Sequence, residues 1–252
     1  MSQQTDIKYL QNISYPGMCR KSGVLVSDKE YILKFSETEA EQINLYSELM
    51  GALLCKQLQL RTSNITLIEH NKHLCLLSEK WELDKNEQYF PLASYYEELL
   101  DTQEQVPYTY SLFKNIIKQK VPNDYETILE TFWGMFIVDF LICNSRSAGN
   151  IGFLHNDIIR LAPIFDCSTE LEYINDNRYK DFDFPVSLMH FDCNGQSFYY
   201  ILTEYKDSYK AKMLEKARKD LNLNKLPYQI KDKFSQYIFD VVSYRFNKLI
   251  SI

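Results

Sequence analysis

Short, mostly apolar runs of the kind that form strands dominate the first third of the chain. Turn-forming residues such as Asp28 and Asn71 separate the runs, which is typical of antiparallel strands. The runs lie at 23–27, 31–35, 64–70 and 73–79. Between the second and third runs, apolar positions recur at helical spacing over 37–58. The pattern therefore predicts an antiparallel sheet with one helix packed against it.

Longer apolar repeats of helical period fill most of the rest of the chain. They predict helices at 91–100, 110–120, 125–143, 208–221 and 229–250. A hairpin-like stretch, 144–171, interrupts them. The pattern predicts an α+β protein of two lobes, a small β-rich lobe over residues 1–80 and a larger helical lobe over 81–252. No repeat or Pro/Gly-rich linker marks the change between them, near 78–84.

Composition narrows the classes of function. The 252 residues are 45% hydrophobic, enough for a sizeable core, and the net charge is −6. An acidic chain argues against direct binding to nucleic acid or to an anionic membrane, since both require a basic surface. No stretch approaches the roughly 20 apolar residues that span a bilayer. The six cysteines form no CxxC pair, so we expect reduced thiols in a cytoplasmic protein.

Lys34 stands inside the apolar run YILKF. A buried ammonium is costly without an anionic partner, and Glu48 on the following helix could supply one. Protein kinases use such a pair to place a lysine on nucleotide phosphates. A lysine that simply points to solvent from an edge strand is the alternative.

A short turn precedes this strand. Gly17, Lys21, Ser22 and Gly23 lie in it, and its backbone N–H groups could cover phosphates. The spacing matches neither the P-loop nor GxGxxG, so the turn is a weak signal by itself.

Asn150 and Asp166 lie within the hairpin-like stretch, at the ends of its two short apolar runs. The apolar run 161–166 predicts a strand that ends on the aspartate. An amide and a carboxylate oxygen brought together in this way could hold Mg²⁺. Taken singly, Asn150 could be a turn residue and Asp166 a helix N-cap. The glycine turn, strand lysine, helix glutamate and Asn–hairpin–Asp unit nevertheless follow one another in the order found in kinases.

These residues resemble the HipA-like and CtkA-like bacterial serine/threonine kinases. The resemblance covers about residues 15–172 and implies a bilobal, protein-kinase-like fold. By this likeness Lys34 contacts the α- and β-phosphates of ATP and Glu48 pairs with it. Asn150 and Asp166 hold Mg²⁺, and the hinge 78–81, with Glu79 and Trp81, meets adenine. The family phosphorylates Ser/Thr of protein targets, and some members are toxins restrained by a DNA-binding antitoxin.

The expected catalytic loop departs from the family pattern. Family members read roughly N-x-D-R-[HN]-x-x-N, whereas this chain reads NSRSAGN. Counting back from Asn150 puts Ser145 at the position of the catalytic Asp and keeps Arg146. Counting forward suggests instead that one residue, the Asp itself, is missing. Neither alignment leaves a carboxylate there, and loss of a general base costs about 10²–10⁴-fold in rate.

Two functions therefore stay open. The first is a protein kinase that uses ATP and Mg²⁺ on Ser/Thr with weakened activity. The second is a catalytically inactive pseudokinase, natural or engineered, that acts as a nucleotide-dependent partner or regulator. In both we expect ATP and a protein substrate or regulatory partner, which could be antitoxin-like. A lipid or small-molecule kinase is a third reading.

Overall fold

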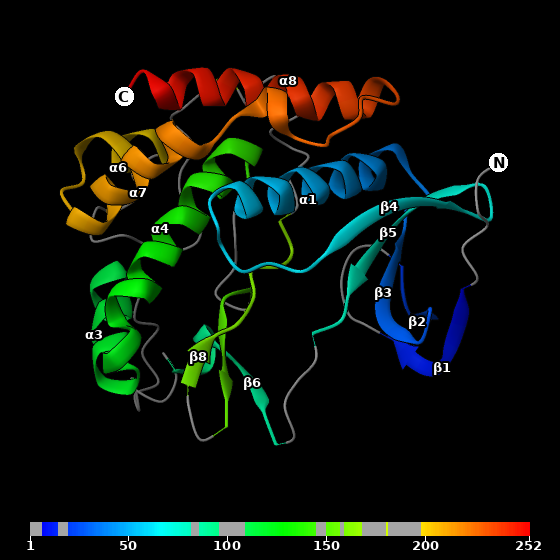
Figure 1. The fold of residues 1–252 in the computed structure, drawn as a ribbon, viewed down its shortest axis with the longest axis horizontal. Coiled ribbons are helices and arrows are strands. Elements are labelled where there is room, and N and C mark those ends of the chain that lie inside the picture. The colour runs from blue at the N-terminus through cyan, green and yellow to red at the C-terminus, as the bar shows by residue number, and fades with distance from the viewer. Residues whose placement is uncertain are drawn as a thin grey trace.

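The structure is a computed structural model, and it describes residues 7–14, 20–81, 86–95, 109–144, 150–156, 159–167, 180 and 198–252. A five-stranded sheet lies at one end of the molecule and most of the helices lie toward the other, as Figure 1 shows. This mixed architecture, a β-sheet lobe with a helical region, confirms the α+β fold class that the sequence predicts.

The five-stranded sheet is antiparallel, with the strand order β1-β2-β3-β5-β4. Its two tight hairpins have positive φ at both central residues, Ser27 and Asp28 in one and Asn71 and Lys72 in the other. This is the conformation of a type I′ turn, whose twist matches that of the flanking strands. The strands are β1 (Lys8–Ser14), β2 (Lys21–Val26), β3 (Lys29–Phe35), β4 (Ile65–His70) and β5 (His73–Glu79).

The two faces of this sheet differ in character. Leu33 and Phe35 of β3 belong to a small apolar core on one face. Because side chains alternate along a strand, Lys34 points to the other face. The edge strands also approach each other, since the Tyr9 hydroxyl and Nε2 of His70 are 2.8 Å apart. The sheet is thus curled around its own core, and its opposite face is left for the helix and the site.

Helix α1 (Glu39–Gln57) covers the Lys34 face. It begins with a capping box: Oγ1 of Thr38 accepts a hydrogen bond from the Glu41 amide, and the Glu41 carboxylate accepts one from the Thr38 amide. Such a box satisfies backbone N–H groups that have no partner within the helix. The start of α1 is therefore fixed, and with it the position of every residue that the helix presents to the sheet.

The helices of the second half form the main core. They are α3 (Tyr110–Lys120), α4 (Tyr125–Ile142), α6 (Phe198–Glu204), α7 (Ser208–Asp220) and α8 (Lys233–Ile250). Trp133 of α4 is fully buried, and its indole N–H donates to the Tyr110 hydroxyl at 2.8 Å. Helices α4 and α8 both pack on α1. Tyr46 of α1 donates to Asp232, the N-cap of α8, at 2.8 Å, so α1 is held between the sheet and the helices.

A second sheet has three strands in the order β6-β7-β8. Strand β6 (Gln88–Pro91) follows the connection between the two halves, whereas β7 (Gly152–His155) and β8 (Ile159–Leu161) form a hairpin. Arg160 donates to both oxygens of the buried Glu87 carboxylate, at 2.8 and 2.9 Å. A two-pronged contact of this kind fixes orientation as well as distance, so β6 is tied firmly to the hairpin.

Three expected elements differ from the observed ones. Pro91 ends β6, so the helix expected over 91–100 is wrong at its start, and the structure describes it only at residues 92–95. Proline is tolerated there because β6 is an edge strand. The strand expected over 161–166 is also wrong, since β8 ends at Leu161. The helix expected from 229 begins at Lys233, because the Asp232 carboxylate caps it.

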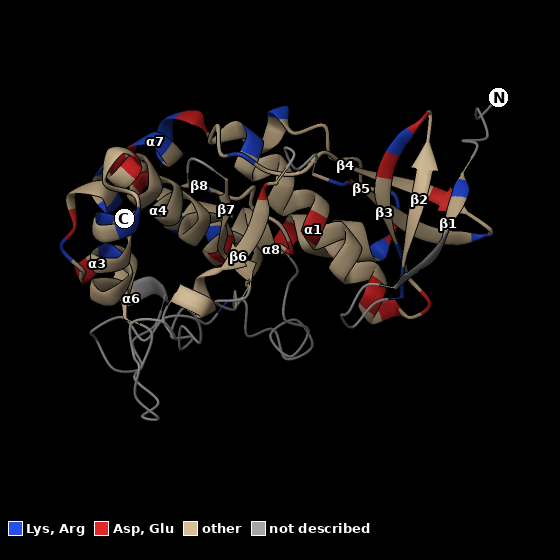
Figure 2. Cartoon of the chain, turned by 90° about the horizontal axis from the view of Figure 1, so that it is seen from below, with Lys and Arg blue, Asp and Glu red and all other residues tan. Residues whose placement is uncertain are grey.

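Charged side chains of the described residues do not gather on a single basic face. Figure 2 shows Lys and Arg mixed with Asp and Glu on α7 and on β3. The cysteines within the described part, Cys55, Cys75, Cys143 and Cys167, are buried. None of the described helices has the length and apolar character needed to cross a bilayer.

Candidate functional site

An ion pair between Lys34 and Glu48 joins the sheet to α1. The Lys34 ammonium donates to both carboxylate oxygens of Glu48, at 2.6 and 2.7 Å. Lys34 is 8% exposed and Glu48 is 4% exposed. The anionic partner expected for the strand lysine is therefore present, and the solvent-facing alternative is excluded. Burial makes this pair sensitive, because removing one partner strands an uncompensated charge.

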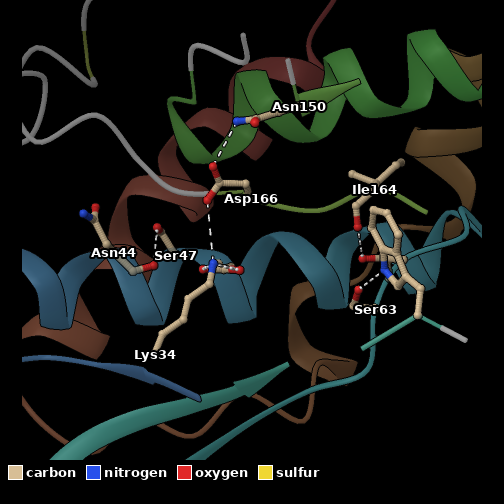
Figure 3. Close-up of polar contacts among 10 residues, drawn as sticks. Lys34, Asn44, Ser47, Ser63, Asn150, Ile164 and Asp166 are labelled. Atoms are coloured by element: carbon tan, nitrogen blue, oxygen red, sulfur yellow. Dashed lines mark hydrogen bonds and ion pairs between the residues drawn. The ribbon is translucent and has the colours of Figure 1, made fainter. Parts of the chain in front are cut away.

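Asp166 completes the cluster from the opposite lobe, as Figure 3 shows. Its Oδ1 lies 3.7 Å from Nζ of Lys34, and its Oδ2 accepts a hydrogen bond from the Asn150 side-chain amide at 2.9 Å. Lys34, Glu48, Asn150 and Asp166 thus form one continuous polar chain across the two halves. The Asp166 side chain is 35% exposed. This polar chain of side chains is therefore accessible to solvent at the Asp166 carboxylate.

The backbone of Asp166 is unusual. Its φ of 53° lies in the left-handed region, which aspartate enters more readily than most residues. Such conformations cost free energy and cluster at functional sites. At Asp166 this conformation accompanies a carboxylate that is turned toward Lys34 and Asn150.

A short bridge to the loop after α1 positions Asp166. The amide of Ile164 donates to the Arg61 carbonyl at 2.8 Å, and the Thr62 hydroxyl donates to the Ile164 carbonyl at 2.8 Å. These bonds replace the strand that the sequence predicts over this stretch. Arg61 and Thr62 follow the end of α1 by four and five residues, so the loop after the helix that carries Glu48 also holds the segment that carries Asp166.

The oxygen ligands of Asn150 and Asp166 fit a magnesium ion. Mg²⁺ prefers carboxylate, carbonyl and water oxygens and is usually held by one or two protein oxygens together with substrate phosphates. An amide and a carboxylate already joined by a hydrogen bond provide such a set. A lysine ammonium beside them would oppose a lone cation, but it would favour a cation that arrives with a polyanion.

The segment before Asn150 also starts from a fixed point. Cys143 ends α4 in the left-handed conformation, with φ of 54°. The Asn144 side-chain amide then donates to Oδ1 of the buried Asp139 at 2.7 Å. Asn144 and Asn150 are thus each anchored by an aspartate. Ser145 and Arg146, the expected catalytic positions, lie between them and outside the described residues.

A family model of the HipA-like C-terminal domain matches residues 13–232. The chain belongs to the HipA-like family. The match covers every residue of the polar chain, from Lys34 and Glu48 to Asn150 and Asp166. The resemblance seen in the sequence is thereby confirmed.

Two solved structures share the fold of this HipA-like chain. The proinflammatory kinase CtkA of Helicobacter pylori matches with a TM-score of 0.80 at 17% identity, over 98% of this chain and 95% of CtkA. HipA of Shewanella oneidensis, solved with HipB and operator DNA, matches with a TM-score of 0.55 at 13% identity, over 95% of this chain and 67% of HipA. No curated protein matches the sequence significantly. Together the family and the fold identify a kinase-like protein.

The structure separates the remaining expected site residues of the HipA-like chain. The turn expected at Lys21, Ser22 and Gly23 is wrong, because these residues belong to strand β2 and pair with β3. Lys21 pairs directly with Lys34 across β2 and β3, so both side chains face the same side of the sheet. Gly23 shares this face, whereas Ser22, which pairs with a residue of the small core, points to the opposite face. Gly17 lies outside the described residues.

The two hinge residues have other partners. The Glu79 carboxylate accepts hydrogen bonds from Asn64, at 2.7 Å, and from Lys29, at 3.4 Å, on the sheet face away from Lys34. Its pKa is lowered, chiefly by the Asn64 hydrogen bond. The indole N–H of Trp81 donates to the Ser63 hydroxyl at 2.6 Å. The Glu79 side chain is therefore not brought to Lys34, and the Trp81 indole is tied to the loop after α1.

Sequence reasoning missed three features of the site. Asp139 of α4 gives no local signal of a role in the site, yet it anchors the start of the expected catalytic loop. Thr62 gives no local signal, because its bond to Ile164 joins segments far apart in the chain. Asn44 lies one helical turn before Glu48, is buried, and its Oδ1 accepts no hydrogen bond among the described residues. Figure 3 shows it near the polar chain.

Close packing at Gly51 holds α1 against the Asp166 segment. A Cβ at this position would lie 2.6 Å from Cβ of Cys167, directly after Asp166, and 3.1 Å from Ile142. Gly51→Ala should therefore lower the free energy of unfolding by about 1–3 kcal/mol through overpacking, despite the better helix propensity of alanine. Urea unfolding measures the free energy of unfolding of each variant. Gly134→Ala is the matched control, because its Cβ would meet methyl ends of flexible side chains. If Gly51→Ala lowers the free energy of unfolding by no more than Gly134→Ala does, the packing argument is contradicted.

Proposed function

We propose that the chain is a protein kinase of low activity that binds ATP with Mg²⁺ and transfers the γ-phosphate to Ser/Thr of a protein target. The observation that supports this most is the continuous chain Lys34–Glu48–Asp166–Asn150. It gathers one cation for phosphates and two oxygen ligands for a metal. In this proposal residues 1–80 are the nucleotide-binding lobe and 81–252 carry the metal-binding hairpin.

Each residue has a defined part in the proposal. Lys34 binds the α- and β-phosphates, and Glu48 holds the ammonium in place. Asn150 and Asp166 ligate Mg²⁺, which would neutralise charge that develops on the phosphates during transfer. Lys21 and Gly23 border the phosphates from the β2 side. Because phosphoryl transfer depends mostly on positioning and electrostatics, this set can support some turnover without a base.

The sequence NSRSAGN favours a second candidate function. It has no carboxylate where the family pattern places the catalytic aspartate, Ser145 standing there when counted back from Asn150. A chain that binds Mg-ATP but transfers nothing would be a pseudokinase that acts as a nucleotide-dependent partner. Because HipA of Shewanella oneidensis assembles with HipB, we also infer a regulatory protein partner, in the cytoplasm, for either function.

Mg-ATP should stabilise the protein, and Asp166→Asn should abolish this effect. A ligand at 100 times its Kd adds about 2.7 kcal/mol of stability, which in a chain of this size raises Tm by roughly 5–10 °C. Asp166→Asn keeps the shape of the side chain but removes the charge that binds the metal. Thermal unfolding with and without Mg-ATP, and with EDTA, measures the change. The exposed Asp240→Asn on α8 is the matched control and should keep the full shift.

Transfer is assayed separately with labelled ATP, Mg²⁺ and a generic protein substrate. Label on substrate or on the chain itself supports the kinase, and stabilisation without any label supports the pseudokinase. If Mg-ATP gives the same Tm as buffer, and no label is transferred, both functions are rejected.

A further inference from the structure

A side-chain amide at the end of α1 forms a pair of hydrogen bonds with the chain beyond α7. Nε2 of Gln57 donates to the Asn222 carbonyl at 3.0 Å, and Oε1 of Gln57 accepts from the Asn222 amide at 2.8 Å. A glutamine amide carries both a donor and an acceptor, as a peptide group does, so Gln57 pairs with Asn222 as a neighbouring strand would. These two bonds fix the last turn of α1 to the connection between α7 and α8.

The middle of α1 is held by a buried tyrosine. Tyr46 is 1% exposed, its hydroxyl donates to Oδ2 of Asp232 at 2.8 Å, and its ring meets Tyr228 edge-on with centroids 6.4 Å apart. Burial, together with the hydrogen bond to Asp232, raises the pKa of Tyr46 far above its usual value, so the hydroxyl stays protonated and remains a donor. Asp232 is itself fixed, because its Oδ1 caps α8 by accepting from the Phe234 and Ser235 amides, each at 2.9 Å.

These two contacts lie on one stripe of α1, opposite the stripe that faces the site. In an α-helix of this length, Tyr46 and Gln57 lie within about 20° of each other around the axis and about 16 Å apart along it. Glu48 lies roughly 160–180° around the axis from both. Figure 1 shows α8 lying along α1. Two contacts well separated along one side of a helix fix its rotation as well as its position.

The opposite stripe of α1 carries parts of the site. Glu48 holds the Lys34 ammonium there, and a Cβ at Gly51 would meet Cys167, directly after Asp166. The loop after α1 also bonds to the segment that carries Asp166. A rotation of α1 would therefore move Glu48 away from Lys34 and shift Asp166 at the same time.

We propose that Tyr46 and Gln57 are positioning residues of the nucleotide site, through which the segment 222–235 controls the affinity for Mg-ATP. Each acts by holding α1 in the rotation that places Glu48 on Lys34. This inference rests on the proposed function, and it adds a coupling between the site and a segment on the far side of α1. Because such coupling is reciprocal, bound Mg-ATP should in turn stabilise the contacts of 222–235.

Native-state hydrogen exchange of the full chain measures how firmly α1 is held. Tyr46→Phe removes only the hydroxyl and leaves the ring on Tyr228. A hydrogen bond to a charged group has an energy that corresponds to roughly 10- to 100-fold in an equilibrium constant, so the amides of α1 around Glu48 should exchange faster by about this factor. Gln57→Met, which removes both bonds to Asn222, should change the exchange in the same direction.

Lys233→Met is the matched control. The ion pair between Lys233 and Glu39 joins the same two helices, at 3.0 Å, but both side chains are exposed. Exposed pairs of this kind contribute little, so exchange from α1 should stay within about threefold of wild type. A general loosening of the contact between α1 and α8 would affect the control as much as Tyr46→Phe.

The double variant Tyr46→Phe/Gln57→Met tests the coupling to nucleotide. Its two substitutions are about 16 Å apart and share no partner, so their effects should add. Calorimetric titration is carried out at a temperature at which circular dichroism shows every variant folded. Affinity for Mg-ATP should fall by roughly 10-fold or more, because apparent affinity falls with the fraction of chains in which α1 is held. In wild type, Mg-ATP should slow exchange of the amides of 222–235, which a contact with only a structural role would not give.

The possible results separate this inference from the proposed function. If the double variant binds Mg-ATP within about twofold of wild type although α1 exchanges faster, the two contacts only pack the helix. If Mg-ATP leaves exchange over 222–235 unchanged in wild type, this segment is not coupled to the site. Either result overturns the inference and leaves the proposed function intact. If the wild-type chain binds no Mg-ATP in the titration, the proposed function fails and the inference fails with it.

Discussion

Lys34→Met should abolish Mg-ATP binding and lower the free energy of unfolding by about 3–5 kcal/mol. The substitution keeps much of the apolar stem but removes the ammonium from between Glu48 and Asp166. Glu48, 4% exposed, is then left as a buried charge without its cation. The loss of stability is therefore larger than the strength of the ion pair itself. Urea unfolding monitored by tryptophan fluorescence gives the stability, and titration with Mg-ATP gives the binding.

The double variant Lys34→Met/Glu48→Leu distinguishes a stranded charge from poor packing. Replacing both partners of a buried pair by apolar residues is often neutral or stabilising, so the double variant should recover most of the lost stability while ATP binding stays absent. Lys29→Met is the matched exposed control, because its pair with Glu79 is largely solvated and should contribute about 0–1 kcal/mol. A loss below 1 kcal/mol for Lys34→Met, or no recovery in the double variant, would contradict the argument.

The Lys34–Glu48 contact was accessible to sequence reasoning because two local rules meet there. Lys34 stands within the apolar run YILKF, where burial is expected, and a buried ammonium demands an anion. The helix that follows offers Glu48 among apolar residues. The strands that flank tight hairpins were predictable for a similar reason, since the turn residues and the alternation agree. The local sequence pattern was enough to predict these contacts, in which both partners belong to elements adjacent in the chain.

The parts that were not predicted depend on contacts between distant segments. Strand β6 exists because it pairs with β7, more than 60 residues later in the chain, and its own sequence carries no clear strand period. The segment 162–166 looks like a strand, but within the described residues its pairing is limited to a bond from the Ala162 amide to the Gly152 carbonyl and an isolated bridge between Ile164 and Thr62. Tyr89 gains its position from a glycine in another element. No local signal reveals which ring will lie on which glycine, so this contact could be found only from the structure.

Ser145→Asp should raise the rate of phosphotransfer by about 10²–10⁴-fold, the usual contribution of a general base. Ser145 stands five residues before Asn150, where the family pattern places the aspartate that accepts the proton of the substrate hydroxyl. Nucleotide affinity should change little, because the phosphate and metal residues are untouched. Transfer of label from ATP to a generic protein substrate, followed over time, measures the rate, and Mg-ATP titration checks that binding is retained.

Because both ends of the expected catalytic loop are anchored, we expect Ser145→Asp to fold normally and to gain activity. Asn144 is bound to Asp139 and Asn150 to Asp166, so both ends are anchored by contacts that do not involve Ser145. Ser147→Asp is the matched control, since it adds the same charge two residues away from the expected base position, and it should not raise the rate. Adding Asp166→Asn to Ser145→Asp should remove the gain, because a base has no effect without the metal site. If Ser145→Asp binds Mg-ATP normally and transfers phosphate no faster than wild type, the missing carboxylate is not what limits turnover. The alignment in which the Asp position is absent from the loop, or the pseudokinase function, then explains the sequence better.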